Sequence, residues 1–266
     1  MSKKLIAKDI YRFIRSAVII AVSFLAGVVI GKNYLSTTEE VYHFKEKLRP
    51  ELVAPRKENI MPFKKGEHLV YRLKSKGINV GTSDMVFMGE VEKEGQALYY
   101  IKFTTEMPGV IDTEHIYTRK KDFLPVLIER DIEKLGKKQP LIEKYDQQAG
   151  VLRVYRPGED EPLQQYDIGA NINNAIALTF YYRSTPDLLK ENRKNRIVLP
   201  KFTFDLVFKG EKRVTTYLGT ENAFYFSSEP SKFHFWLSKS KERLPLKIQQ
   251  PGLMGYSMIL DSVKMD

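Results

Sequence analysis

The sequence contains no cysteine among its 266 residues, and it has a single tryptophan and four histidines. Without cysteine the chain can form no disulfide and no thiolate metal site, and it has no cysteine to serve as nucleophile or to carry a lipid. The histidines do not occur at H-x-x-x-H or H-E-x-x-H spacing; they are His43, His68, His115 and His234. We therefore expect neither a metal nor a cofactor.

Catalytic motifs are also missing. The sequence has no G-x-S-x-G nucleophile turn and no glycine-rich phosphate loop that follows a strand. Two acid pairs, Asp112 with Glu114 and Glu129 with Asp131, have the i,i+2 spacing that places both side chains on one face of a strand. A glycosidase could use such pairs, but a solvated outer sheet face explains them more simply. We expect a protein that is not an enzyme, and a hydrolase is the least favoured alternative.

The charge distribution argues against nucleic-acid binding. The net charge is +10, and residues 1–32 hold six basic groups and one acid, so half of the excess lies in that short segment. A nucleic-acid-binding module more often concentrates its basic groups on one face of the folded domain. The basic character is therefore in part a targeting feature.

The N-terminal segment has the pattern of a membrane anchor. Residues 16–31 are free of charged side chains and, as a helix, would span about 24 Å. Five basic residues precede this segment, so the positive-inside rule places residues 1–15 in the cytoplasm and residues 33–266 in the periplasm of a bacterial cell. A cleaved signal peptide is the alternative, but no A-x-A site follows the apolar run. We predict an uncleaved single-pass anchor in the inner membrane.

A juxtamembrane helix and a proline-containing linker are expected over residues 32–62, followed by one periplasmic domain over residues 63–266. From residue 63 onward, hydrophobicity alternates with a period of two, which predicts an antiparallel sandwich or barrel. The expected strands are 67–74, 78–88, 96–106, 113–120, 123–133, 140–147, 150–156, 202–209, 212–218, 222–228, 233–239, 244–249 and 256–264.

One segment departs from the strand pattern. Residues 173–183 predict a helix that is apolar around almost its whole circumference, which ends at Ser-Thr-Pro and should be buried against or inside a curved sheet. The basic run 190–201 that follows it is interpreted as a solvated loop, with contact to anionic lipid headgroups as the alternative.

The hairpin at the start of the domain has two distinct faces. Its first strand predicts Leu69, Tyr71 and Leu73 on the inner side. Gly81 leaves a position of the second strand without a side chain, which indicates a bend or the close approach of another group.

Aromatic residues alternate along several of the expected strands. They are either ordinary core or the wall of an apolar cavity, because a half-closed barrel of this size can hold a ligand. For the second interpretation the predicted wall residues are Tyr71, Tyr99, Phe103, Phe180, Tyr181, Phe224 and Phe235.

Several segments match, in order, motifs that occur together in one family of proteins. The pattern F-x-x-G-E-x-L-x-Y followed by G-I-x-x-G is met by Phe63, Gly66, Glu67, Leu69, Tyr71, Gly77, Ile78 and Gly81. The segments PVLIERDIEKLGK, EKYD, NNAIALTFYYRS and FWLSKSKERLPLKIQQPGLMGYSMILDSV resemble later family motifs in the same order, including a helix that ends in Tyr-Tyr-x-Arg. The usual Asp-x-x-Ser start of that helix is absent, since Asn173, Asn174 and Ala175 stand there.

These segments together resemble a family of exported bacterial proteins known as domain of unknown function 3108. That family is similar in fold to the periplasmic lipoprotein carriers of the Lol type. That resemblance implies a mainly β, half-open antiparallel barrel with a buried short helix, and an apolar cavity for acyl chains. Two functions remain open at this point. The domain holds an apolar ligand such as a lipid acyl chain, in lipid or lipoprotein handling, or it is an assembly partner in a cell-envelope complex with a fully packed barrel.

Overall fold

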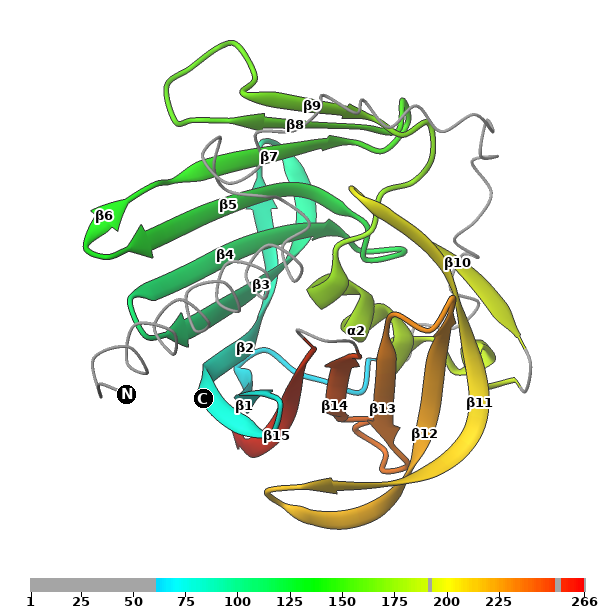
Figure 1. Cartoon of the computed structure of the whole chain (residues 1–266). Coiled ribbons are helices and arrows are strands. Elements are labelled where there is room, and N and C mark those ends of the chain that lie inside the picture. Colours follow the sequence, from blue (N-terminus) through cyan, green and yellow to red (C-terminus); the bar gives the residue numbers. More distant parts are fainter. Residues whose placement is uncertain (1–60, 191–192, 252–254, 266) are drawn as a thin grey trace, which may run out of the picture.

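The computed structural model describes residues 61–190, 193–251 and 255–265, and these form one antiparallel sheet that curves around a short helix (Figure 1). The predicted cytoplasmic tail, membrane anchor and nearly all of the predicted linker lie outside the described residues. Within the part of the chain that the structure describes, no helix is long and apolar enough to cross a membrane.

The sheet has fifteen strands within the described ranges. They are β1 (Glu67–Ser75), β2 (Ile78–Lys93), β3 (Gln96–Met107), β4 (Val110–Arg119), β5 (Pro125–Lys134), β6 (Lys137–Lys138), β7 (Leu141–Asp146), β8 (Val151–Tyr155), β9 (Gln164–Asp167), β10 (Lys194–Leu199), β11 (Phe202–Thr216), β12 (Gly219–Glu229), β13 (His234–Ser238), β14 (Pro245–Gln250) and β15 (Tyr256–Met265).

Strands that follow each other in sequence are mostly neighbours in the sheet. The pairing of the first strand with the last joins the two halves of the sheet. The first strand, β1, pairs with the last, β15, in a register that places Glu67 opposite Met265. The order is therefore β10 to β15, then β1 to β5, and then β7 to β9, with β6 attached to β5. Among the described residues β9 and β10 are the two outer strands, so the sheet curls without closing.

Irregular pairing accompanies the curvature. The register shifts between Val70 and Tyr71 in the β1–β15 pair, between Phe87 and Gly89 in the β2–β3 pair, and between Phe208 and Glu211 in the β11–β12 pair. Such bulges bend a strand and increase its local twist, which allows a long sheet to wrap around its contents.

The content of the curved sheet is helix α2 (Ala175–Ser184), which lies between β3–β5 on one side and β10–β13 on the other (Figure 1). The side chain of Asn174 caps it, because its Oδ1 accepts from the backbone N–H groups of Ile176 and Ala177 at 2.9 and 3.0 Å. The helix gives way to a short 3₁₀ turn, η1 (Pro186–Leu189). Proline at the first position of that turn cannot continue an α-helix.

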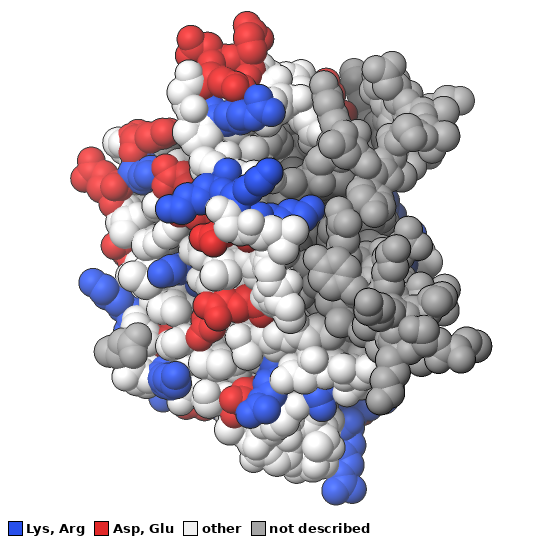
Figure 2. Space-filling model, turned by 60° about the vertical axis from the view of Figure 1, so that its left-hand side comes forward, with Lys and Arg blue, Asp and Glu red and all other residues white. Residues whose placement is uncertain are grey.

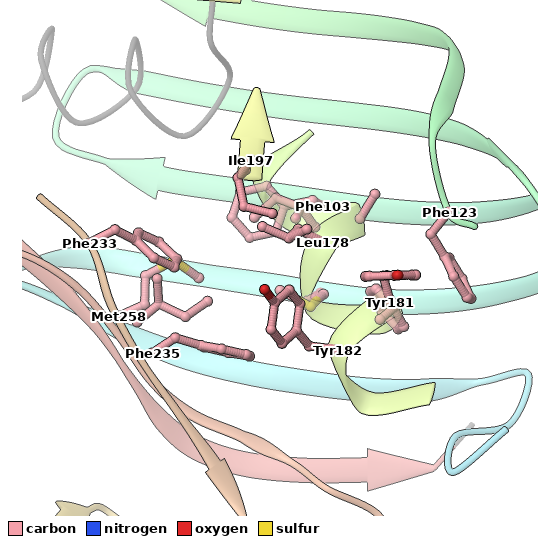
Figure 3. Close-up of a cluster of buried hydrophobic side chains, with 14 of the residues drawn as sticks. Phe103, Phe123, Leu178, Tyr181, Tyr182, Ile197, Phe233, Phe235 and Met258 are labelled. Atoms are coloured by element: carbon pink, nitrogen blue, oxygen red, sulfur yellow. The ribbon is translucent and has the colours of Figure 1, made fainter. Parts of the chain in front are cut away.

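The helix joins both halves of the sheet into one core. Phe180 lies with its ring centroid 5.0 Å from that of Phe63 and 5.7 Å from that of Phe87, on the β2 side. Tyr182 lies 5.1 Å from Phe226 and 6.1 Å from Phe235, on the β12–β13 side (Figure 3). Full burial of one such side chain contributes about 1.5–3 kcal/mol, so the contacts of α2 stabilise both halves of the sheet in addition to the β1–β15 pairing.

The fold confirms the main sequence expectations. The sheet is mainly antiparallel and open, the buried helix begins two residues after the predicted start, and Leu69, Tyr71 and Leu73 face the core. Two expectations are wrong. The basic run 190–201 is not one loop, because it contains β10, and the segments 202–209 and 212–218 form the single strand β11.

Both errors have a physical cause. In β10 the charged positions come first and the buried ones, Ile197 to Leu199, come last, so the strand has no two-residue alternation. In β11 the Lys-Gly-Glu sequence that separates the two expected strands forms a bulge between the Phe208–Phe226 and Glu211–Phe224 pairs, and Gly210 adopts a φ of 85° there.

Candidate functional site

A cleft opens at one end of the strands, where three segments meet. The start of β2 supplies Asn79–Thr82, the β3–β4 turn supplies Glu106–Ile111, and the end of β5 with the following turn supplies Glu133, Leu135 and Gly136. The cleft has a volume of about 560 Å³. Ligand sites in proteins commonly enclose about 300–1,000 Å³, so the space is sufficient for a small molecule or an alkyl chain.

Gly81 brings the end of β3 close to β2 at this point. A Cβ atom on Gly81 would lie 2.1 Å from the carbonyl oxygen of Glu106 and 2.7 Å from Cγ of Met107. Only glycine permits this approach, because a real Cβ is not found that close to a backbone oxygen. The glycine that the sequence marked as a site of close approach thus lies in the wall of the cleft.

The two hairpin turns of the cleft are connected to each other. The backbone N–H of Leu135 donates a hydrogen bond to the carbonyl oxygen of Gly109 at 2.8 Å. Leu135 and Gly136 both have positive φ, 51° and 75°, as a two-residue hairpin turn of type I′ requires. This conformation leaves the Leu135 side chain 65% exposed beside the cleft.

The cleft has an apolar floor that belongs to the core. Met107 and Val110 are buried, and both are members of the main hydrophobic cluster. Ile111 is 43% exposed, and because it follows Val110 in β4 its side chain leaves the sheet on the face opposite the floor. Leu135, in the β5–β6 turn, is an exposed aliphatic side chain beside the cleft. An apolar floor that is continuous with the core and has an exposed aliphatic side chain beside it can accept an apolar ligand.

The charged residues among those that line the cleft are both acidic. They are Glu106 and Glu133, and no lysine, arginine or histidine of the described residues lines it. The surface around the cleft carries charges of both signs. Figure 2 brings the strand ends at the left of Figure 1 forward, and it shows acidic and basic side chains interspersed over the face.

The seven residues predicted to form a cavity wall lie elsewhere, and none of them lines the cleft. Six are buried in the main cluster, where they pack against each other and against α2, while Phe224 is partly buried and packs against Phe208. The six are Tyr71, Tyr99, Phe103, Phe180, Tyr181 and Phe235. Figure 3 shows several of these rings within the cluster.

Two of these residues show how the interior is filled. Tyr71 is fully buried, and its hydroxyl donates to the carbonyl oxygen of Pro245 at 2.9 Å, while burial raises its pKa far above the usual range. Tyr99 stacks on Phe123 at a centroid distance of 5.1 Å. The rings are thus held by contacts within the protein.

A buried polar cluster was not anticipated from the sequence. Asp112 and Glu114 do share a face of β4, but the interpretation of that face as solvated is wrong, because both side chains are buried next to Arg130 of β5. Arg130 contacts Asp112 directly and lies 3.5 Å from Glu143 of β7. Three acids thus surround the guanidinium of Arg130. Because their charges are opposite, β4, β5 and β7 can bury these groups at the N-terminal end of α2.

Burial alters the protonation of this cluster. It raises the pKa of Glu114 to about 8, although the guanidinium of Arg130 acts in the opposite direction. Burial also raises the pKa of Glu143, which accepts a hydrogen bond from the Tyr145 hydroxyl at 2.7 Å. Glu114 is hydrogen-bonded to Asn174, the cap of α2, so the cluster is connected to the helix. The other pair, Glu129 and Asp131, is on the outer face as predicted.

Three solved structures resemble this chain at low sequence identity. A β-barrel-like protein of domain of unknown function DUF1849 from Brucella abortus has 8% identity and a TM-score of 0.45, over 75% of this chain and 97% of its own. A candidate exported protein with a YmcC-like fold from Bacteroides fragilis has 10% identity and a TM-score of 0.28, over 77% and 98%. A candidate lipoprotein from Parabacteroides distasonis has 12% identity and a TM-score of 0.29, over 78% and 100%.

A search of curated proteins gave no match to this sequence. The family comparison is informative, because one family model covers residues 70–261, from the first strand of the sheet to the last. This range includes the start of β2, the two turns and the acidic pair of the cleft. The chain belongs to the family described as "Protein of unknown function (DUF3108)".

Proposed function

We propose that this domain is a non-enzymatic binding module of the bacterial cell envelope, and that it holds an apolar ligand such as a lipid acyl chain in the cleft between β2 and the β3–β4 and β5–β6 turns. The observation that supports this function is the apolar floor of that cleft, where Met107 and Val110 extend the core to an open space of about 560 Å³.

The energetics require no catalytic group. Each CH₂ that moves from water into an apolar site contributes about 0.8 kcal/mol, so the partial burial of one chain gives useful affinity. Leu135, beside the cleft, is the exposed side chain that a bound chain would cover first.

The cleft is a better candidate than the space between the two halves of the sheet. Helix α2 and the aromatic cluster occupy that space, and the predicted wall residues make their contacts with each other. A ligand there would have to displace buried rings such as Phe180. The cleft requires no such displacement.

The proposal includes the anchor predicted at residues 16–31. A single-pass segment in the inner membrane would keep the binding domain in the periplasm, near a source of acyl chains. Both the anchor and the compartment are part of the proposal and rest on the sequence pattern.

Photolabelling tests the site directly. Cells that express the full chain would be fed a fatty acid with a photoreactive group in its alkyl chain, and after irradiation the labelled peptides would be identified by mass spectrometry. We expect labels on 107–111 and 133–136. The substitution Leu135→Glu should abolish this labelling, whereas Leu163→Glu, also at an exposed leucine, should leave it unchanged. Labelling confined to other strands, or equal labelling of the variants, would contradict the proposal.

A second candidate function is that of an assembly partner in an envelope complex. Two observations favour it, namely the packed interior and the two outer strands, β9 and β10, which have one sheet neighbour each among the described residues. An unpaired strand edge can bind an extended segment of another protein. Site-specific crosslinkers placed in β9 and β10 would detect such a partner, and the absence of any protein adduct at either edge would argue against it.

A further inference from the structure

The outer face of β12 and β13 carries two aromatic side chains in contact. Tyr225 of β12 lies directly opposite Trp236 of β13, and their ring centroids are 4.8 Å apart. Their neighbours in sequence, Phe226 and Phe235, pack against Tyr182 of α2. Because adjacent residues of a strand point to opposite faces, the two aromatic side chains leave the sheet on the side away from the helix.

A lysine lies over each of these two rings. The amine of Lys212, in β11, is 4.7 Å from the ring centroid of Tyr225. The amine of Lys247, in β14, is 5.1 Å from the ring centroid of Trp236, and the two residues are directly opposite each other in the sheet. We call these four residues the lysine–aromatic patch. None of them lines the cleft, so the patch is a separate feature.

The aromatic floor of the patch is held in place by the protein. The hydroxyl of Tyr225 and Nδ1 of His234 form a hydrogen bond of 2.8 Å, and Trp236 is only 5% exposed. Burial lowers the pKa of His234, and the charges of Lys212 and Lys247 lower it further. The imidazole is therefore neutral at pH 7, so its Nδ1 can accept from the hydroxyl. A floor whose side chains are already fixed is preorganised for a ligand.

The positive charge of the patch has no acidic counterpart within the part of the chain that the structure describes. No ion pair there involves Lys212 or Lys247. By contrast Lys209, also in β11, contacts Glu229 at 2.7 Å. Burial lowers the pKa of Lys247, and the charge of Lys212 lowers it further, so the two cations repel each other. An anion between the two amines would relieve this repulsion.

The donors of the patch suit a phosphate group. An ammonium is a compact point charge on a flexible stem, so two lysine amines can turn toward one tetrahedral anion. A planar carboxylate is more often recognised by the two parallel donors of an arginine, and the patch contains none. A phosphate offers several acceptor oxygens, so each amine can have its own. The indole N–H of Trp236 adds a buried donor that has no acceptor among the described residues.

We propose that the lysine–aromatic patch binds a phosphate group, which lies between the amines of Lys212 and Lys247 and above the rings of Tyr225 and Trp236. The ligand class is a phosphate ester, and its source is either a soluble phosphorylated molecule or the headgroup of an anionic phospholipid. This inference goes beyond the proposed function, because it assigns a second ligand to a different face of the sheet.

Trp236 is the single tryptophan of the chain, so its fluorescence reports on the patch. The full chain in maltoside micelles would be titrated with glycerol phosphate, with sodium acetate at the same ionic strength as the reference anion. In a second arm phosphatidylglycerol would be mixed into the micelles, with diacylglycerol as the phosphate-free reference lipid. Calorimetry would confirm each affinity. A saturable response to glycerol phosphate assigns a soluble ligand, and a response to phosphatidylglycerol alone assigns a lipid headgroup.

Three double variants test the role of the lysines. Lys212→Gln with Lys247→Gln removes both charges and should weaken binding at least tenfold. Lys212→Arg with Lys247→Arg keeps both charges and should retain most of the affinity. Lys137→Gln with Lys138→Gln is the matched control, because both residues are exposed in β6 and neither belongs to the patch. It should bind as the unsubstituted protein does, and circular dichroism would verify that all variants are folded.

Three results would overturn the proposal. The first is that neither glycerol phosphate nor phosphatidylglycerol gives a response beyond that of its reference. The second is that acetate binds as tightly as glycerol phosphate. The third is that the glutamine variant of the patch binds as tightly as the control variant. Photolabelling of the cleft does not depend on the patch, so this proposal and the proposed function stand or fail separately.

Discussion

Arg183, near the C-terminal end of α2, holds Glu67 of β1 in a two-pronged ion pair across 116 positions of sequence. Nη1 lies 2.6 Å from Oε1 and Nη2 lies 2.8 Å from Oε2, and both side chains are buried. Arg183 also donates to the carbonyl oxygen of Glu242, and its guanidinium lies 4.8 Å from the ring centroid of Phe63. Bidentate geometry and additional hydrogen bonds are what make a buried pair tolerable.

Removal of one partner of this pair should destabilise the domain strongly. Arg183→Met leaves Glu67 as a buried carboxylate without its cation, and we expect a loss of about 3–5 kcal/mol in the free energy of unfolding. The measurement is denaturant unfolding followed by the fluorescence of Trp236, the single tryptophan of the chain. The double variant Glu67→Leu and Arg183→Met should lose less than the single variants combined. Additive losses would show that the two residues act independently.

The Glu67–Arg183 pair also shows what the sequence could reveal. Both residues belong to segments that resembled family motifs, Glu67 in the first hairpin and Arg183 in Tyr-Tyr-x-Arg, yet nothing in the sequence indicated that they contact each other. Alternation of apolar residues predicted the strands and the inward face of β1, because a two-residue period follows directly from strand geometry. Contacts between distant elements depend on how the sheet curls, and local patterns do not contain that information.

The buried acids mark a second limit of local patterns. The spacing of Asp112 and Glu114 correctly placed both on one face, but the spacing is the same for a solvated face and for a buried face with a cationic partner. The cleft could not be predicted from the sequence for a similar reason. Its walls come from three segments, and only Gly81 gave a signal, as a strand position without a side chain.

The ionisation of Glu114 should make stability depend on pH in the neutral range. The pKa of Glu114 is about 8 in the folded protein and near 4.5 in the unfolded chain. Between these values the folded state binds one proton more, so stability falls as pH rises from about 4.5 to about 8 and the slope from this group disappears above that. Near the middle of the range this group contributes a loss of about 1.4 kcal/mol per pH unit.

The variant Glu114→Gln isolates this contribution. It remains neutral at every pH, so its free energy of unfolding should decline less between pH 5 and pH 8 than that of the unsubstituted protein. Glu143 also has a raised pKa and will keep part of the slope in both proteins. Equal slopes over this range would show that Glu114 titrates normally in the folded state.

Any side chain at position 81 should disturb the wall of the cleft. Gly81→Val places carbon atoms where the Glu106 carbonyl and the Met107 side chain now lie, and overpacking of this kind costs about 1–3 kcal/mol. Thermal unfolding and photolabelling of 107–111 would both be measured, and both should decrease. Gly95→Asn, outside the cleft, is the control, because no atom lies within 4 Å of a Cβ there and asparagine tolerates a positive φ. If Gly81→Val unfolds and labels as the control does, β3 does not approach β2 as described.

Asn174, the cap of α2, should both stabilise the domain and lower the pKa of Glu114. Asn174→Ala removes the acceptor for the N–H groups of Ile176 and Ala177, and it also removes the side-chain hydrogen bond to Glu114. We expect a loss of about 1–2 kcal/mol. Asn174→Ser retains an acceptor at the cap and should recover most of this loss at pH 6.

The pH dependence distinguishes the two roles. The hydrogen bond from Asn174 lowers the pKa of Glu114, so its removal should raise that pKa further. The decline in stability would then extend to higher pH in both position-174 variants, whereas only the alanine variant would lack the cap. If the serine variant is as unstable as the alanine variant at pH 6, where Glu114 is protonated, the contact with Glu114 and not the cap accounts for the role of Asn174.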